Sequence, residues 1–338
     1  MCDIKIHGLN EILVNNDLIK IINSTHFYIK KKEKIIPWYD IFTYFFYKIN
    51  DKLYLHNVLF DKVKNSYFID NNYVNNIEHV NLLKNINFKQ LNINKAFILT
   101  YTHSNAGHLF SEIMHQIHIY FKNNLYDYNI LITKELLEEN TFIKSIIYYF
   151  FTEDKIIIYD EYTVLSFDES FIFKYSNGKE SNSINFLLNK LKKETIMKKM
   201  YNNICLIKTH ETKNQNPLKS FSCDYSFFIE QQLFNIIIPE NYNIEELFNI
   251  IYNADNIIMS WGCCSYLNGI FVNENSNFLL LCHEKYNNEY NNVQNIFNSG
   301  WFPEKCKNKN ILYDLPCELD ELVKKNLQNK INVMLDKK

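Results

Sequence analysis

Short apolar runs alternate with longer stretches of helical periodicity from about residue 95 onward, and this alternation constrains the fold more than any other feature. Runs of this length and composition are typical of strands buried on both faces of a parallel sheet. The runs lie at 96–100, 129–132, 155–159, 204–207, 235–238, 256–259 and 277–281. The helical patterns lie between them, at about 108–124, 134–150, 182–202, 224–233, 243–253 and 264–271. The pattern predicts βαβ units and an α/β fold.

A polar junction after the helical stretch 182–202 divides the α/β part into two halves of similar size. Residues before position 90 are rich in Asn and Tyr and contain short alternating segments, which predict a small β-containing region. Apolar residues at helical spacing near the C-terminus predict an amphipathic helix docked on the body. The expected divisions are 1–90 for the N-terminal region, 91–202 and 203–315 for two α/β domains, and 316–338 for the terminal helix.

The composition supports a chain with a large core. Its 338 residues suit two domains, and a hydrophobic share of 47% excludes global disorder. The formal charge of −2 argues against a broad nucleic-acid surface. All 36 basic residues other than His are Lys, so any bound anion must be held by Lys or backbone N–H groups rather than by a guanidinium. The frequent Lys, Asn, Ile, Tyr and Phe have AT-rich codons, which favours an AT-rich genome such as that of a large DNA virus or a protist.

The cysteines and the apolar segments point to no secreted or membrane class. The eight Cys are scattered without a C-x-x-C pair, which argues against a structural zinc site, and we expect mostly buried, reduced thiols. The N-terminus does not resemble a signal peptide, and no apolar stretch reaches the ~18 residues of a membrane span. We therefore expect neither a signal peptide nor a membrane anchor.

A first polar cluster follows the run at 96–100 and opens the helical pattern at 108–124. At helical spacing, one side of this helix carries His108, Ser111, Glu112, His115 and His118. The opposite side is apolar, so we expect it to pack on the sheet while the His-rich side points away. This side is either a solvated face or part of a crevice beyond the carboxyl end of a strand, where open α/β sheets bind ligands.

In such a crevice, His108 or Glu112 could act as a general base. A metal site is a further alternative for this face, but the spacing is not H-E-x-x-H, and we expect no metal.

A second cluster follows the run at 256–259, where small residues separate a strand from a helix start. Gly262 allows close approach of a ligand, and the N–H groups of 263–265 could hold an anion. The segment matches neither G-x-G-x-x-G nor the P-loop. The alternatives are a tight structural turn and a nucleophilic Cys263 or Cys264. A third segment, after the run at 204–207, adds the cations Lys208, Lys213 and Lys219.

These segments, taken in order, resemble motifs of the family 61 glycosyltransferases. Residues 105–112 resemble the family's helix start, which begins N-x-x-H and ends in Glu, and 239–248 resemble its P-E-x-(x)-S-x-x-E-Q segment. Residues 254–268 are similar to its A-D-x-x-x-G-x-H-G-A-x-x-x-N block. Lys208, with Lys213 or Lys219, resembles two basic positions of its middle strand and the segment that follows. The resemblance covers about residues 95–285.

The resemblance implies two Rossmann-like domains that face a cleft in a GT-B-like arrangement, with the acceptor on 91–202 and the nucleotide sugar on 203–315. It implies an inverting, metal-independent glycosyltransferase that moves a sugar from a nucleotide sugar, expected to be a UDP-sugar, to a hydroxyl of a glycan or protein acceptor. No cofactor is expected. Without an anchor, the implied location is the cytoplasm, or a viral factory if the source is a virus.

The resemblance also implies roles for single residues. His108 or Glu112 would take the proton of the acceptor hydroxyl, and the 262–265 backbone with Lys208 or Lys219 would stabilise the leaving diphosphate. The residues expected at the nucleotide sugar are Lys208, Lys213, Lys219, Trp261, Gly262, Cys263, Cys264, Ser265 and Asn268. Those expected at the acceptor are Asn105 and His115.

Three departures from the family pattern keep other functions open. Trp261 stands where the family has His, Cys263 where it has Ala, and Lys at best where it has Arg. One alternative is a non-catalytic descendant that retains the fold as a binding or scaffold module. Another is a Cys-dependent hydrolase that uses Cys263 or Cys264.

Overall fold

The fold was obtained as a computed structural model of the full chain, and it divides into two compact units, Met1–Lys179 and Glu180–Lys338. The structure describes residues 13–14, 18–31, 42–49, 52–61, 66–73, 89–99, 106–139, 141–160, 163–173, 181–207, 223–260, 267–281, 309–312 and 320–335.

The first unit is built on a mixed sheet that contains nine strands among the described residues. The strands are β1 (Leu13–Val14), β2 (Leu18–Lys31), β3 (Phe42–Ile49), β4 (Lys52–Asp61), β5 (Ser66–Tyr73), β6 (Lys89–Ile98), β7 (Asn129–Thr133), β8 (Ile156–Tyr159) and β9 (Thr163–Phe173). Their order is β5-β4-β3-β2-β9-β6-β7-β8, and β1 pairs with β2. The strand pairs from β5 to β9 are antiparallel, whereas β9, β6, β7 and β8 are parallel.

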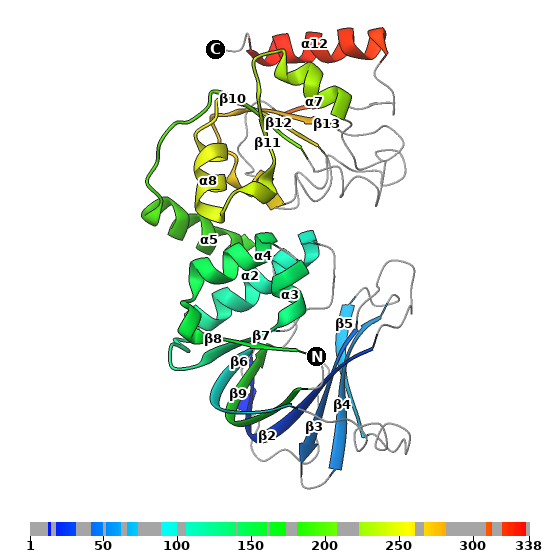
Figure 1. Ribbon diagram of the computed structural model, residues 1–338, viewed down its shortest axis with the longest axis vertical. Coiled ribbons are helices and arrows are strands. Elements are labelled where there is room, and N and C mark those ends of the chain that lie inside the picture. Colours follow the sequence, from blue (N-terminus) through cyan, green and yellow to red (C-terminus); the bar gives the residue numbers. More distant parts are fainter. Residues whose placement is uncertain are drawn as a thin grey trace. The chain divides into compact units, whose positions relative to one another are not determined.

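Helices cover the parallel part of this sheet. The helices are α2 (Ala106–Lys122), α3 (Lys134–Glu139), α4 (Thr141–Phe150) and the short η1 (Glu153–Lys155). Figure 1 shows α2, α3 and α4 on one face of the sheet. The rings of Phe110 on α2 and Phe142 on α4 pack with centroids 5.7 Å apart. Because α2 leads from β6 to β7 and the α3–α4 pair leads to β8, this part of the unit is a series of βαβ units.

The N-terminal strands share the sheet of the first α/β segment. β2 pairs with β9 from Leu18↔Phe173 to Tyr28↔Thr163. The expected boundary at residue 90 therefore falls inside one sheet. The expected boundary at 202 also differs from the structure, where the second unit begins at Glu180. Periodicity alone carried no information about this pairing, because its partners lie more than 130 positions apart in the chain.

The second unit is built on a sheet of five parallel strands. They are β10 (Asn203–Leu206), β11 (Asn235–Ile237), β12 (Asn256–Ser260), β13 (Asn277–Leu281) and β14 (Lys309–Leu312), in the order β11-β10-β12-β13-β14. Every residue of β12 and of β13 is buried. Burial of alternate residues on both faces explains why these strands appear in the sequence as continuous apolar runs.

Helices lie on both faces of the second sheet (Figure 1). They are α5 (Ser181–Glu194), α7 (Cys223–Glu230), η3 (Pro239–Asn241), α8 (Ile244–Tyr252), η4 (Gly269–Phe271) and α12 (Glu321–Leu335). On one face, Leu327, Ile331 and Met334 of α12 join a buried cluster with Ile229 of α7 and Ile258 of β12. Figure 1 shows α8 on the other face, where Phe248 packs on Phe271 with ring centroids 5.7 Å apart.

Two of the expected helices differ in extent from those in the structure. The stretch expected at 134–150 contains two helices, α3 and α4. The stretch expected at 182–202 ends as a helix at Glu194. The chain then continues without regular structure, and a pair of hydrogen bonds holds it: the Lys198 N–H donates to Asn249 Oδ1 at 2.8 Å, and Asn249 Nδ2 donates to the Lys198 carbonyl at 2.9 Å. These two bonds take the place of helical hydrogen bonds, and no local sequence pattern predicts them.

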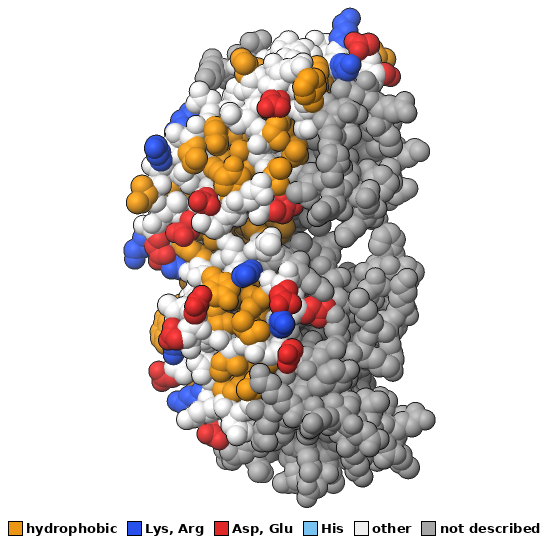
Figure 2. Space-filling model, viewed as in Figure 1, with side chains coloured by type: hydrophobic (Ala, Val, Ile, Leu, Met, Phe, Trp, Pro, Cys, Tyr) orange, Lys and Arg blue, Asp and Glu red, His pale blue; other side chains and the backbone are white. Residues whose placement is uncertain are grey.

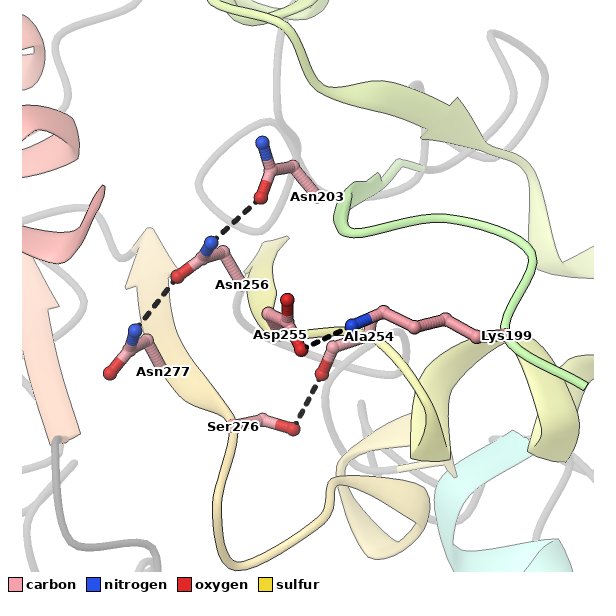
Figure 3. A network of polar contacts seen from close by, with 7 residues as sticks. All are labelled: Lys199, Asn203, Ala254, Asp255, Asn256, Ser276 and Asn277. Carbon is pink, nitrogen blue, oxygen red and sulfur yellow. Dashed lines mark hydrogen bonds and ion pairs between the residues drawn. The ribbon is translucent and has the colours of Figure 1, made fainter. Parts of the chain in front are cut away.

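Three asparagines join the amino ends of β10, β12 and β13 (Figure 3). They stand in register, Asn203↔Asn256↔Asn277. Asn256 Nδ2 donates to Asn203 Oδ1 at 2.7 Å, and Asn277 Nδ2 donates to Asn256 Oδ1 at 2.8 Å. Asn277 Nδ2 also contacts the carbonyl of Met334 at 3.2 Å, which connects the row to α12. We call these three residues the asparagine row.

The described surface carries charges of both signs. On the face shown in Figure 2, Lys side chains are interspersed with Asp and Glu, and no large region of one sign is visible among the described residues. Within the described part of the chain, no helix is both long and apolar enough to cross a bilayer. The mixed α/β architecture with parallel strands in both units is compatible with two Rossmann-like domains.

Candidate functional site

The strand order of the second unit contains a point where the direction of winding reverses. Numbered along the chain, its strands lie in the order second, first, third, fourth, fifth. From β10 the chain moves outward to β11, and from β12 it moves to the opposite edge through β13 and β14. The reversal therefore lies between β10 and β12. In open α/β sheets, ligands bind beyond the carboxyl ends of the strands at this kind of position.

The two segments singled out in the sequence follow these two strands. Leu206 near the end of β10 is in register with Met259 of β12, so both strands end at the same edge of the sheet. The lysine-bearing segment continues from β10, and the small-residue segment continues from β12. Among the expected nucleotide-sugar residues, those that lie outside the described residues are Lys208, Lys213, Lys219, Trp261, Gly262, Cys263, Cys264 and Ser265.

Two polar residues that flank the small-residue segment are described. Asn268, an expected site residue, is buried directly before η4. Ser260, which the sequence interpretation did not select, is the last residue of β12 and is only 3% exposed. A signal was present in the sequence, because Ser260 is the one hydroxyl at the end of an otherwise apolar run, directly before Trp261 and Gly262.

Ala254 and Asp255, the first residues of the 254–268 block, lie at the other edge of the sheet, directly before β12. Asp255 precedes β12, and its carboxylate lies 2.6 Å from Lys199 Nζ (Figure 3). The Ala254 carbonyl accepts a hydrogen bond from Ser276 Oγ at 2.7 Å. β12 therefore separates these two residues from the segment that follows its carboxyl end. Ala254 and Asp255 have structural contacts, while Ser260 lies at the other edge.

The segment 239–248, which resembles a second family motif, forms a helix start. Asn243 is the N-cap of α8, and its side chain accepts from the Glu246 N–H at 2.9 Å. The Glu246 carboxylate in turn accepts from the Asn243 N–H at 3.1 Å. This reciprocal pair is a capping box, which satisfies N–H groups at the helix start. The pattern in this segment is thus accounted for by local structure.

The first unit has its own reversal of winding. Its parallel strands lie in the order β8-β7-β6-β9, or third, second, first, fourth along the chain, which matches the first four positions of the Rossmann order. The reversal lies between β6 and β9, where Ile98 is in register with Ile172. Helix α2 begins at Ala106, shortly after β6 ends. Asn105 lies outside the described residues, and His108 lies in the first turn of α2 with a side chain outside them.

The polar side of α2 differs from the expected outward-facing side. Glu112 is 5% exposed and Gln116 is also buried, while His115 and His118 are half-buried. Gln116 Nε2 donates to the Glu112 carbonyl at 3.1 Å. The interpretation as a solvated face therefore does not hold for Glu112. A buried carboxylate and half-buried imidazoles are groups that can transfer protons when a substrate reaches them.

Within the part of the chain that the structure describes, no three His, Cys, Asp or Glu side chains are grouped so that they could hold a metal ion. This does not include the side chain of His108, which lies outside the described residues.

Comparison with known proteins gives no identification. No protein-family model matches the chain, and the search of curated proteins finds no significant match.

Proposed function

We propose that the chain is an inverting, metal-independent glycosyltransferase with a GT-B-like fold, which uses a nucleotide sugar, expected to be a UDP-sugar, and a hydroxyl of a glycan or protein as acceptor. The observation that carries the proposal is the strand order of the second unit. The winding reverses between β10 and β12, the two strands that lead into the lysine-bearing segment and the Gly262 segment.

The second unit would bind the donor. The leaving diphosphate would be stabilised by the 262–265 backbone and by Lys208, Lys213 or Lys219, because the chain has no Arg to supply a bidentate contact. Asn268 is buried next to this segment and would help to fix it. Trp261 would stack on the base or the sugar.

The first unit would bind the acceptor. His108 lies in the first turn of α2, and Glu112 lies one turn later in the interior. One of them would accept the proton of the acceptor hydroxyl as its oxygen attacks C1 of the sugar and the bond from C1 to the diphosphate breaks. Asn105 and His115 would position the acceptor.

Trp261 also favours a second candidate, a non-catalytic descendant, because it replaces a His of the family motif. Such a protein would bind nucleotide sugars without turnover. A Cys-dependent hydrolase would instead be inactivated by thiol alkylation, whereas the transferase should tolerate Cys263→Ala.

The first experiment is a thermal-shift screen of nucleotides, followed by assay of the best-binding nucleotide sugar for release of nucleoside diphosphate. We expect turnover in the presence of a glycan acceptor. Of the variants His108→Ala and Glu112→Gln, the one that removes the base should lower kcat by about 100-fold or more and leave nucleotide affinity within about twofold. Binding without turnover by the unmodified chain would favour the non-catalytic alternative. Absence of binding by every nucleotide would contradict both.

A further inference from the structure

Ser260 has an unusual environment for a buried hydroxyl. It closes β12 at the carboxyl edge of the second sheet, 3% exposed, and its Oγ has no hydrogen-bond partner among the residues that the structure describes. Buried polar atoms are nearly always hydrogen-bonded, so a buried hydroxyl without a protein partner requires an explanation. One explanation is that the partner belongs to a bound molecule.

Among the described residues near Ser260, few groups could form a hydrogen bond with its hydroxyl. Ser260 stands in register with Leu281 of β13. Alternate residues of a strand share a face, so Ser260 lies on the face of Ile258, which belongs to the apolar cluster with Leu281 and α12. Among the described residues, the interior side is therefore apolar. A polar partner must come from the carboxyl edge, where the winding reverses.

Ser276 shows the contrast within the same sheet. It is also 3% exposed, but it lies near the amino end of β13, and its Oγ donates to the Ala254 carbonyl at 2.7 Å (Figure 3). The two serines have equal burial and lie at opposite edges. The Ser276 hydroxyl at the amino edge has a backbone partner, whereas the Ser260 hydroxyl at the carboxyl edge has none among the described residues.

We propose that Ser260 is a ligand-binding residue whose hydroxyl donates a hydrogen bond to a diphosphate oxygen of a bound nucleotide. This inference rests on the proposed function and adds to it a residue that the sequence did not select. A hydroxyl is a suitable donor here because the chain has no Arg, so anion binding depends on Lys, backbone N–H groups and neutral donors. Hydrogen bonds from hydroxyls to charged oxygens are short and strong.

The test is calorimetric titration of the full chain with UDP, together with measurement of thermal stability. Ser260→Ala should weaken UDP binding by about tenfold or more, because a hydrogen bond to a charged group is lost. Its Tm without UDP should not fall, since the substitution removes a hydroxyl that has no partner among the described residues. The matched control, Ser276→Ala, should lower Tm and leave UDP affinity unchanged. Ser260→Cys is nearly isosteric with a poor donor, and it should reproduce the loss of affinity if the Ala variant does not fold.

The outcomes separate this inference from the proposed function. If the unmodified chain binds UDP and both Ser260 variants bind it equally well, the inference is overturned and the proposed function stands. A lower Tm for Ser260→Ala with unchanged affinity gives Ser260 a structural role and also overturns it. If the unmodified chain binds no UDP, the UDP-sugar proposal fails and the inference fails with it.

Discussion

Tyr120 shows at the scale of one residue how the first unit encloses a polar group. Its hydroxyl donates to the Tyr128 carbonyl at 3.1 Å, and its ring contacts those of Phe97, Phe121 and Phe151 with centroids 5.1 to 5.5 Å apart. Burial raises the pKa of Tyr120 to about 12, with smaller contributions from Tyr126 and Asp127. The phenol is therefore held neutral as a hydrogen-bond donor.

This pKa predicts a loss of stability in alkali. The ionised phenol is better accommodated in the unfolded chain, where the pKa is 10.0, than in the fold, where it is about 12. The contribution of Tyr120 is complete below pH 10 and is lost as the pH rises towards 12. Compared with Tyr120→Phe, the unmodified chain should lose about 1.4 kcal/mol of unfolding free energy between pH 8 and 11. Denaturant titrations across that range provide the measurement, and parallel curves for the two proteins would contradict the assignment.

Ser260 shows what sequence could reveal at single positions. The run 256–259 and the following Gly262 pointed to the carboxyl edge of β12, because a strand that leads into small residues is typical of a ligand-binding turn. The difference between Ser260 and Ser276 could not be predicted, since the partner of Ser276 is a carbonyl 22 positions away. The side of α2 that carries Glu112 was recognised as unusual, but its burial depends on tertiary packing.

At the scale of elements, continuous apolar runs predicted strands well. β7, β10, β12 and β13 lie where the sequence placed them, because strands covered on both faces need apolar residues at every position. β9 was missed. Its sequence includes the exposed Asp168, and its neighbours β2 and β6 come from distant parts of the chain, so no local run marks it. After α5 ends at Glu194, the chain is held at Lys198 by a distant partner, Asn249.

The asparagine row gives a prediction for strand association in the second unit. Asn256 is its centre, so Asn256→Ala would leave Asn203 Oδ1 without its donor and remove an acceptor of the buried Asn277. We expect a loss of about 2 to 4 kcal/mol of unfolding free energy, since two hydrogen bonds among largely buried groups are lost.

Asn235→Ala is a suitable control for that variant. Asn235 Nδ2 also reaches the row, donating to the Asn203 carbonyl at 3.1 Å, but the contact is exposed. Its loss should cost about 1 kcal/mol or less. Equal effects of the two substitutions in urea unfolding would show that the row does not add to stability in the way described.

At the scale of the whole molecule, the sequence predicted an N-terminal region, two α/β domains and a terminal helix, and the structure divides the chain into two units at Lys179 and Glu180. The boundary could not be located from composition, because α5 reads in the sequence as part of one helical pattern that extends to 202. In addition, β2 joins the first sheet by pairing with β9, which is distant in the chain. Most of the expected donor residues lie outside the described residues, whereas the strand order that brings their segments to one edge is described. That order, rather than any single side chain, supports the central claim.

The most direct test of this claim is hydrogen exchange of the full chain with and without a saturating nucleotide sugar, chosen by the thermal-shift screen. If the nucleotide binds where the winding of the second unit reverses, peptides covering 206–219 and 259–268 should become protected together. Peptides that cover the asparagine row at the opposite edge should change little, apart from those that also contain these segments. Protection at the amino edge alone, or no change at either segment with bound nucleotide, would contradict the claim.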